Sequence, residues 1–316
     1  MDLRAIRVLS LCSGVGGLDL GVRLALPAAR TTCYVEREAY CISVLLARIQ
    51  DEALDDAPVW TDVRSFDGLP WRGTVDLIIG GYPCQPFSVA GQRRGAEDER
   101  HLWPAIARII AEIRPLACFF ENVPGHLTLG FREVRGELES MGYRVEAGLF
   151  TAAEVGAPHQ RERLFILADA QRNGGPGRRR AGDLAGAARD AEGEGLQRER
   201  SGDAADDCGA ADVADGGGER LEGDGEGGPE AGPAGRGGGA EVLFPPGPGD
   251  RAGWERLLAA DPALEPALRG DADGLADRVD RLRACGNGVV PLVAAYALRT
   301  LLARSEREGE RMAGEE

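Results

Sequence analysis

Residues 8–21, VLSLCSGVGGLDLG, run from a hydrophobic stretch through a glycine-rich turn into a helical pattern. Glycines let the backbone approach a ligand closely, and the first turn of a helix offers unpaired amide groups. By itself this pattern does not separate a ligand site from a structural turn. Two acidic residues favour the ligand site: Glu36 ends the next β-like run, and Asp62 ends VWTDV. A carboxylate about 20 residues after such a turn commonly binds ribose hydroxyls.

Around this stretch, residues 1–168 alternate β-like runs with helical patterns, which predicts an α/β fold with a parallel sheet wrapped by helices. Each run ends in a polar or glycine-rich turn, and an open α/β sheet binds its ligands at those carboxyl ends. We predict strands at Ile6–Leu11, Thr32–Val35, Val75–Ile79, Ala117–Phe120 and Leu164–Leu167, and helices at Tyr40–Ile49 and Leu102–Ile113.

The composition changes after residue 168. Residues 169–250 contain 23 of the 46 glycines and few large apolar side chains. Such a segment cannot bury enough surface to offset its ordering entropy, so we expect it to be largely disordered. Order is predicted to resume in helices at Trp254–Leu268 and Gly288–Leu302, the second packing against the N-terminal strand. We therefore expect an ordered domain at 1–168, completed by 284–316, and a variable region at 169–283.

The net charge of −15 is concentrated in the variable region, where residues 169–283 hold 15 arginines and 25 acidic residues. This charge argues against nonspecific binding of a polyanion over the whole surface. A DNA-binding groove would have to be built from locally clustered arginines, and salt should weaken it.

The seven cysteines and three histidines show no metal-ligand spacing, so we expect no metal. Several cysteines lie in apolar runs, which favours a reducing compartment without disulfides. We find no secretory signal and no run near the roughly 18 apolar residues of a membrane span. The expectation is a cytoplasmic protein without a membrane segment.

A second motif follows the run at residues 75–80 and reads GGYPCQPFS at 80–88. Cys84 lies at the predicted carboxyl end of a strand, between two prolines that stiffen the turn. An arbitrary cysteine is most simply interpreted as a small buried hydrophobe. A Pro-Cys-Gln-Pro-Phe-Ser string after Gly-Gly is far more specific.

With these motifs the chain resembles the DNA cytosine-5 methyltransferase family of prokaryotic or phage type, whose signature is the Pro-Cys-Gln loop. Further blocks follow in the family order, and together they cover residues 8–168 and 281–302: ENV at 121–123, GAPHQRERLFILA at 156–168 and RLRACGNGVVP at 281–291. The resemblance implies a Rossmann-like methyltransferase fold and S-adenosylmethionine as cofactor. It also implies double-stranded DNA as the partner of a monomeric protein, in restriction-modification or in protection of phage or host DNA.

The chemistry explains the catalytic residues that the resemblance implies. Carbon 5 of cytosine is a poor nucleophile, and a Cys84 thiolate adding to carbon 6 would activate it. Glu121 would supply a proton at nitrogen 3 if burial raises its pKa. By resemblance, Arg163 would hold the cytosine oxygen and Arg161 would organise the catalytic loop. The base must swing out of the duplex to be reached.

The resemblance also implies binding residues. The segment at 89–101 resembles the mobile loop that closes over the flipped base. The expected DNA-binding residues are Gln85, Ser88, Arg93, Arg94 and Arg100, and the expected cofactor-binding residues are Ser13, Gly14, Gly16, Gly17, Glu36, Asp62, Pro83, Leu102, Asn287 and Val289.

The chain departs from the family pattern at several points. Ser10 and Cys12 stand where Asp and Phe are common, and His159 stands where Gln is more usual. The region at 169–280, where the family places a folded recognition domain, is mostly glycine and acid. Two alternatives therefore stay open: the tRNA-methylating branch of the same family, and a catalytically weakened DNA-binding relic. A dehydrogenase is disfavoured because its chemistry does not need the Pro-Cys-Gln turn.

Overall fold

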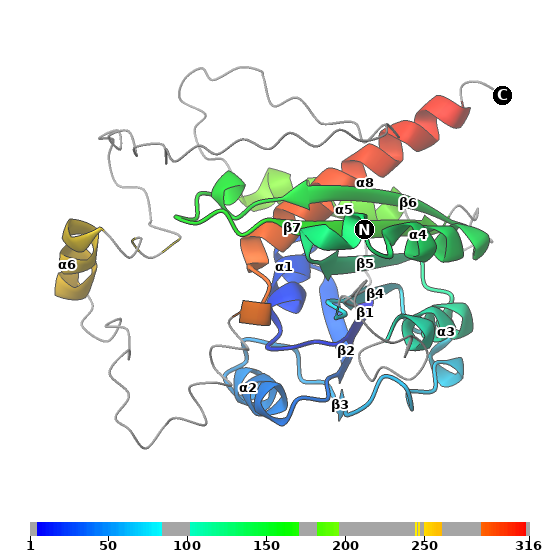
Figure 1. The fold of residues 1–316 in the computed structure, drawn as a ribbon, viewed down its shortest axis with the longest axis horizontal. Helices are drawn as coiled ribbons and strands as arrows, with labels where there is room; N and C mark the ends of the chain where they lie inside the picture. The colour runs from blue at the N-terminus through cyan, green and yellow to red at the C-terminus, as the bar shows by residue number, and fades with distance from the viewer. Residues whose placement is uncertain are drawn as a thin grey trace, which may run out of the picture.

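A computed structural model describes residues 5–83, 102–170, 182–195, 250–260 and 286–313, together with residues 244 and 246. Seven strands in this part of the chain form one sheet of order β3-β2-β1-β4-β5-β7-β6 (Figure 1). They are β1 (Ile6–Leu11), β2 (Ala29–Val35), β3 (Val59–Trp60), β4 (Leu77–Gly80), β5 (Ala117–Asn122), β6 (Tyr143–Phe150) and β7 (Arg163–Ala170). The helices are α1 (Gly17–Ala25), α2 (Ala39–Gln50), α3 (Trp103–Ile113), α4 (Phe131–Ser140), α5 (Gly182–Gly195), α6 (Arg251–Ala260) and α8 (Pro291–Ala313), with short 3-10 turns η1 (Leu69–Trp71), η2 (Pro124–Leu127) and η3 (Ala153–Val155).

The direction of the strands determines which residues meet at the edge that carries the site. Strands β1 to β5 pair in parallel, so their carboxyl ends lie along one edge of the sheet. Strand β7 is antiparallel to both β5 and β6, and its first residues therefore lie at the same edge as the end of β5. This arrangement confirms the Rossmann-like methyltransferase fold expected from the sequence.

Alternating side chains cover the two faces of the sheet with separate cores. In β4, Leu77 and Ile79 face one core, whereas Ile78 faces the other. The first core is closed by α1, α5 and α8, and the second by α3 and α4 (Figure 1). A smaller cluster of Tyr34, Leu45 and Leu54 holds α2 near the β2 side of the sheet. Removing such apolar surface from water is the main force that holds helices on a sheet.

Helix α8 brings the end of the chain back to its beginning. It packs against α1 and also contacts α5, β6 and β7. Gly21 permits this approach, because a Cβ atom there would lie 2.6 Å from the Ala294 Cβ and 2.7 Å from the Pro291 carbonyl oxygen. The predicted helix at Gly288–Leu302 starts at Pro291 and runs on to Ala313. Its main partner is α1, and its buried residues share the first core with Ile6 and Val8 of the N-terminal strand.

Other predictions differ from the structure in their bounds or in kind. The expectation of little order at 169–250 is wrong for residues 182–195, which form α5, where Leu184, Ala185 and Ala188 are buried against the first core. Asp169 and Ala170 belong to β7, so the strand extends past the predicted boundary. The predicted helix Trp254–Leu268 begins earlier and ends at Ala260, and residues 261–268 lie outside the described part of the chain.

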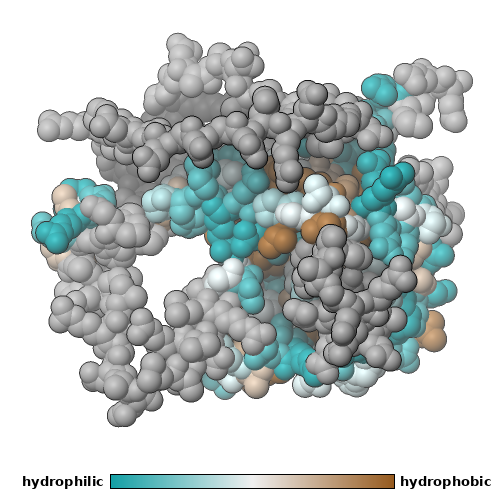
Figure 2. All heavy atoms as spheres, viewed as in Figure 1, coloured by the Kyte–Doolittle hydropathy of each residue, from teal (hydrophilic) through white to brown (hydrophobic). Residues whose placement is uncertain are grey.

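The described surface is mostly polar. Figure 2 shows hydrophilic side chains over most of the coloured part of this face, with a small hydrophobic group near its middle. In the part of the chain that the structure describes, no helix combines the length and the apolar character needed to cross a membrane.

Candidate active site

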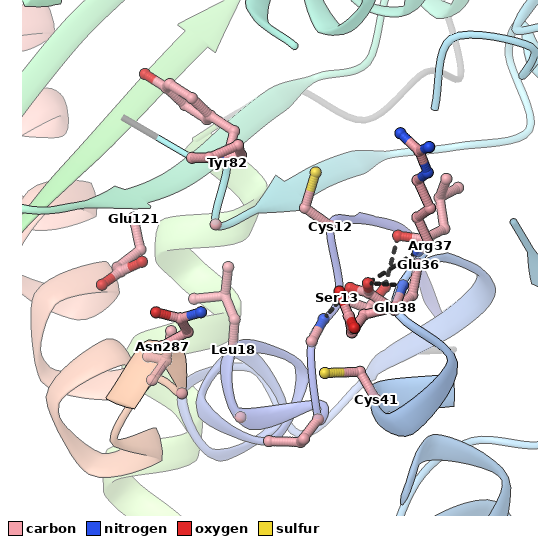
Figure 3. Close-up of a pocket in the computed structure, with 18 of the residues that line it drawn as sticks. Cys12, Ser13, Leu18, Glu36, Arg37, Glu38, Cys41, Tyr82, Glu121 and Asn287 are labelled. Atoms are coloured by element: carbon pink, nitrogen blue, oxygen red, sulfur yellow. Dashed lines mark hydrogen bonds between the residues drawn. The ribbon is translucent and has the colours of Figure 1, made fainter. Parts of the chain in front are cut away.

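A cavity of about 780 Å³ lies at the edge of the sheet where the parallel strands end. Its walls come from the turn after β1, the ends of β2, β4 and β5, the start of β7, and the residues before α8. Figure 3 shows Glu36 and Glu121 at opposite ends of this cavity, with Leu18 between them. The volume lies in the range usual for small-molecule and cofactor sites.

The turn after β1 is tight and is built on left-handed backbone conformations. Gly14 has φ 55° and Gly16 has φ 82°, values that glycine adopts without a steric penalty. Ser13 anchors the turn, since its amide donates to the Val35 carbonyl oxygen at 3.2 Å. A Cβ atom at Gly17 would lie 2.5 Å from the Val289 carbonyl oxygen, so this glycine lets the residues before α8 approach.

Among the predicted cofactor-binding residues, Gly16 is the one that does not line the cavity. A Cβ atom at this position would point at Leu54, 2.6 Å from its Cδ1 atom. Gly16 precedes the first residue of α1 and faces the small core beneath α2. Gly16 turns the chain at this point, and its assignment to the cofactor site stays a prediction.

Glu36 holds the glycine turn to the end of β2. Its carboxylate accepts the Gly14 amide at 2.7 Å and the amides of Arg37 and Glu38 at 2.8 Å each (Figure 3). A carboxylate has about four acceptor positions, so capacity remains for a ligand hydroxyl. Asp62 follows β3 and lines the same end of the cavity.

The middle of the cavity is apolar. Leu18 and Val63 are buried in its wall, and Leu102 lines it from the start of α3. Burial, with a smaller contribution from Glu36, raises the pKa of the Cys12 thiol to about 12. Cys12 therefore stays protonated and acts as a small apolar wall residue. Carboxylates at one end, open glycine backbone and an apolar middle fit a ligand that carries a ribose, a flat base and a charged tail.

The other end of the cavity holds an acid paired with an arginine. Because β5 and β7 are antiparallel, Glu121 near the end of β5 meets Arg163 at the start of β7, with Nε 3.0 Å from Oε1. Burial raises the pKa of the Glu121 carboxyl to about 7, against the opposing effects of Arg163 and Arg161. Gly81 leaves room for the acid, since a Cβ atom there would lie 3.2 Å from Oε2.

Arg161 contacts the segment before α8. Its Nη2 donates to the Gly286 carbonyl oxygen at 2.8 Å and also to the Gly288 carbonyl oxygen. Asn287 and Val289 from this segment line the cavity, where Figure 3 shows Asn287 beside Leu18. These two hydrogen bonds of Arg161 thus lie on the side of the site that Asn287 and Val289 line. The loop that it was expected to organise lies outside the described residues.

Several cavity residues were not among those predicted. Arg37, Glu38 and Cys41 line the cavity near Glu36, and Tyr82 and Asn122 line it near Glu121. Tyr82 lies in the GGYPCQPFS motif and Asn122 in the ENV motif. Their proximity to Cys84 and Glu121 in the sequence could have indicated that they line the site. Arg37 and Glu38 directly follow the predicted carboxylate, and for Cys41 we identify no sequence signal.

The predicted nucleophile and DNA-contact residues lie outside the described part of the chain. They are Cys84, Gln85, Ser88, Arg93, Arg94 and Arg100. The preceding residue, Pro83, does line the cavity, as do the predicted residues Ser13, Gly14, Gly17, Glu36, Asp62, Leu102, Asn287 and Val289. Among the described residues, no group of three or more His, Cys, Asp or Glu side chains could hold a metal ion.

The sheet order and the position of the cavity define the class of Rossmann-like methyltransferases that depend on S-adenosylmethionine. The family model for C-5 cytosine-specific DNA methylase matches residues 6–176, more than half of the chain. The chain therefore belongs to the C-5 cytosine-specific DNA methylase family.

Individual relatives are similar over about half of the chain. The type II methyltransferase M.AplI of Arthrospira platensis is 36% identical over 164 residues, which are 51% of this chain and 45% of that protein. The type II methyltransferase M.NgoMIV of Neisseria gonorrhoeae is 34% identical over 164 residues, 51% of this chain and 50% of that protein. The crystal structure of S. pombe Dnmt2 methyltransferase has a TM-score of 0.46 at 23% identity, covering 54% of this chain and 52% of that one. The chain thus spans about half the length of the curated relatives it matches.

Proposed function

We propose that this protein is a DNA cytosine-5 methyltransferase that uses S-adenosylmethionine and forms a covalent adduct through Cys84. The observation that carries the proposal is the buried Glu121–Arg163 pair at one end of the cavity. Gly81, Tyr82 and Pro83 line the same end, and Cys84 is the next residue in the chain. Glu121, an acid that holds its proton near neutral pH, would then contact the same base as the nucleophile Cys84.

In the proposed reaction the Cys84 thiolate bonds to carbon 6 of a flipped cytosine, and electron density moves toward carbon 5 and nitrogen 3. Glu121 donates a proton at nitrogen 3, and Arg163 holds both the acid and the base oxygen. Bound S-adenosylmethionine would supply an electrophilic methyl group, and its transfer to carbon 5 would release S-adenosylhomocysteine. Loss of the carbon 5 proton to water and return of the nitrogen 3 proton to Glu121 would then expel the Cys84 thiolate and restore the aromatic ring.

The cofactor would be held by the residues that line the remainder of the cavity. Glu36 and Asp62 suit the ribose and base end, and the Gly14 and Gly17 backbone suits the charged tail. Asn287 and Val289, held in place by Arg161, close the wall from the end of the chain. The catalytic domain proposed here therefore consists of residues 1–168 completed by residues 284–316.

The proposed partner is double-stranded DNA, bound by a monomer in the cytoplasm. Membership of the family and the names of type II relatives support a role in restriction-modification. Gln85, Ser88, Arg93, Arg94 and Arg100 are the proposed DNA contacts, the arginines acting on phosphates.

The test is incubation of the purified protein with S-adenosylmethionine and matched amounts of unmethylated DNA or tRNA, followed by mass spectrometry of the nucleosides. We expect 5-methylcytosine in DNA and none in tRNA. Methylation confined to tRNA would replace the DNA substrate with an RNA one. Binding of DNA without transfer to either nucleic acid would leave a DNA-binding relic as the better account.

A further inference from the structure

We propose that the buried Tyr82–His126 pair is a positioning device that fixes the approach of the chain to the nucleophile relative to Glu121. The inference rests on the proposed function, because it assigns Tyr82 and His126 to the machinery around Cys84. Neither residue takes part in the proposed reaction itself. Both would act by holding the segments that carry Cys84 and Glu121.

The pair is buried and closely packed. The Tyr82 Oη atom lies 2.9 Å from His126 Nε2, and the two residues are 4% and 5% exposed. Figure 3 shows the Tyr82 ring directed away from the cavity. It packs edge-on against His126 and Phe120, and it is tilted against Trp103 at a centroid distance of 5.4 Å. The hydroxyl is thus the polar end of an otherwise apolar contact.

The direction of this hydrogen bond follows from the state of the imidazole. Burial lowers the pKa of His126, opposed by a hydrogen bond to the Leu129 backbone that favours the protonated ring. The ring is therefore neutral near pH 7, and it offers one donor and one acceptor nitrogen. In the tautomer whose proton lies on the other ring nitrogen, Nε2 accepts the Tyr82 hydroxyl proton. Rotation of the ring would break this bond.

The main chain of Tyr82 is fixed as well. Its carbonyl oxygen accepts Asn122 Nδ2 at 3.1 Å, and Asn122 Oδ1 accepts the Val123 amide at 2.9 Å. Asn122 directly follows the acid Glu121, whereas His126 lies on η2 in the next turn. Tyr82 is therefore tied at both its backbone and its side chain to the segment that carries the acid. Only Pro83 separates Tyr82 from Cys84 in the sequence.

The decisive variant is Tyr82→Phe, which removes one hydroxyl and keeps the ring. Tyr143→Phe is the matched control, because Tyr143 is also 4% exposed and donates its hydroxyl proton to the Pro115 carbonyl oxygen at 3.0 Å, far from the cavity. We expect Tyr82→Phe to slow single-turnover methyl transfer by about tenfold to a hundredfold, since small misplacements at a reacting centre have effects of that size. The affinity for S-adenosylmethionine should stay within about twofold, as misplacement of the nucleophile spares cofactor binding. Tyr143→Phe should transfer methyl at the wild-type rate.

Two further measurements separate positioning from a loss of stability. In a double-mutant cycle with His126→Ala, the double variant should be no slower than His126→Ala alone, because the two groups form one interaction. Hydrogen–deuterium exchange of full-length Tyr82→Phe should be faster in the peptide that follows Gly81, and Tyr143→Phe should match the wild type there.

The exchange readout does not need an active enzyme, so it tests the positioning role even if the proposed function fails. A wild-type protein that transfers no methyl group would refute the proposed methyltransferase function. Unchanged hydrogen–deuterium exchange in Tyr82→Phe would refute the positioning role of the Tyr82–His126 pair. A wild-type rate in Tyr82→Phe, or equal losses in Tyr82→Phe and Tyr143→Phe, would also overturn the inference.

Discussion

Burial and ion pairing shift the pKa of Glu121 in opposite directions. The carboxyl is 7% exposed, and burial penalises its charged form more than Arg163 and Arg161 stabilise it. Its pKa therefore rises to about 7. A group that is balanced between its two forms near neutral pH is suited to proton transfer at physiological pH.

This balance predicts the pH dependence of the rate. The proton-donating form of Glu121 exists below its pKa, so the single-turnover rate should fall as pH rises through about 7. Glu121→Gln should slow transfer by roughly 10²–10⁴ and remove this falling limb, because the amide does not titrate. Glu112→Gln is the control, since Glu112 pairs with Arg108 on α3, outside the cavity lining, and should leave the limb unchanged. A wild-type rate and pH profile in Glu121→Gln would remove Glu121 from the mechanism.

At the scale of the elements, a buried carboxyl joins β1, β2 and α1. Asp19 on α1 accepts the Ser10 hydroxyl at 2.9 Å and the Thr31 hydroxyl at 3.0 Å. Complete burial raises its pKa to about 6 despite these bonds. The carboxyl fixes the helix relative to both strands, but its charged form is costly.

The cost predicts how stability depends on pH. The folded chain holds this proton up to about pH 6, whereas the unfolded chain releases it near pH 4. The free energy of unfolding should therefore fall as pH rises between these values, by about 3 kcal/mol from this group alone. Asp19→Asn should lack the part of this pH dependence that Asp19 contributes. Denaturant unfolding of both proteins at a series of pH values would measure it as the difference between their free energies of unfolding. A difference that is flat between pH 4 and 6 would show that the carboxyl titrates normally.

The contact between α1 and the segment before α8 predicts a second effect at this scale. Gly17→Ala would bring a methyl group to about 2.5 Å from the Val289 carbonyl oxygen and push that cavity wall outward. We expect about a tenfold loss of S-adenosylmethionine affinity by calorimetry, which corresponds to about 1.4 kcal/mol. Gly136→Ala on α4 meets open space, so it should bind normally and be neutral or slightly stabilising. Equal affinity in both variants would contradict this account of the wall.

The elements also show what the sequence could and could not predict. Both bounds of strand β1 were predicted correctly, because a mostly apolar run ends just before a glycine turn. Helix α4 was missed because it buries only Val134 and Leu138, and β6 because its partly buried residues do not alternate cleanly. Helix α5 depends on contact with α8, which local composition does not reveal.

For the site, the two carboxylates of the cofactor end followed from their place after strands. The meeting of Glu121 with Arg163 depends on the antiparallel direction of β7, which spacing along the chain does not encode. The family resemblance placed both residues in the site, but their ion pair was not predicted. A run of glycines does not indicate which of them lines the cavity, and Gly16 faces Leu54 instead.

At the scale of the whole molecule, the two ends of the chain build one cavity. Residues 286–289 line it and lead into α8, which packs against α1. A chain ending near residue 280 should therefore lose S-adenosylmethionine binding. Because that truncation also removes a core helix, Asn287→Ala in the full chain is the sharper variant. Its exposed side chain lines the cavity, so affinity should fall while the melting temperature stays unchanged. Normal cofactor binding by the truncated chain would show that the N-terminal part is sufficient.

The central claim is that this chain methylates carbon 5 of cytosine in DNA through Cys84. Methylome sequencing of DNA from cells that express either the wild-type protein or Cys84→Ala tests it most directly, with both proteins checked for equal S-adenosylmethionine binding. The account predicts 5-methylcytosine in a defined short sequence context with the wild-type protein, and none with Cys84→Ala, because the thiol bonds to the base and not to the cofactor. Equal methylation with both proteins, or a methyl group on another base or atom, would contradict it.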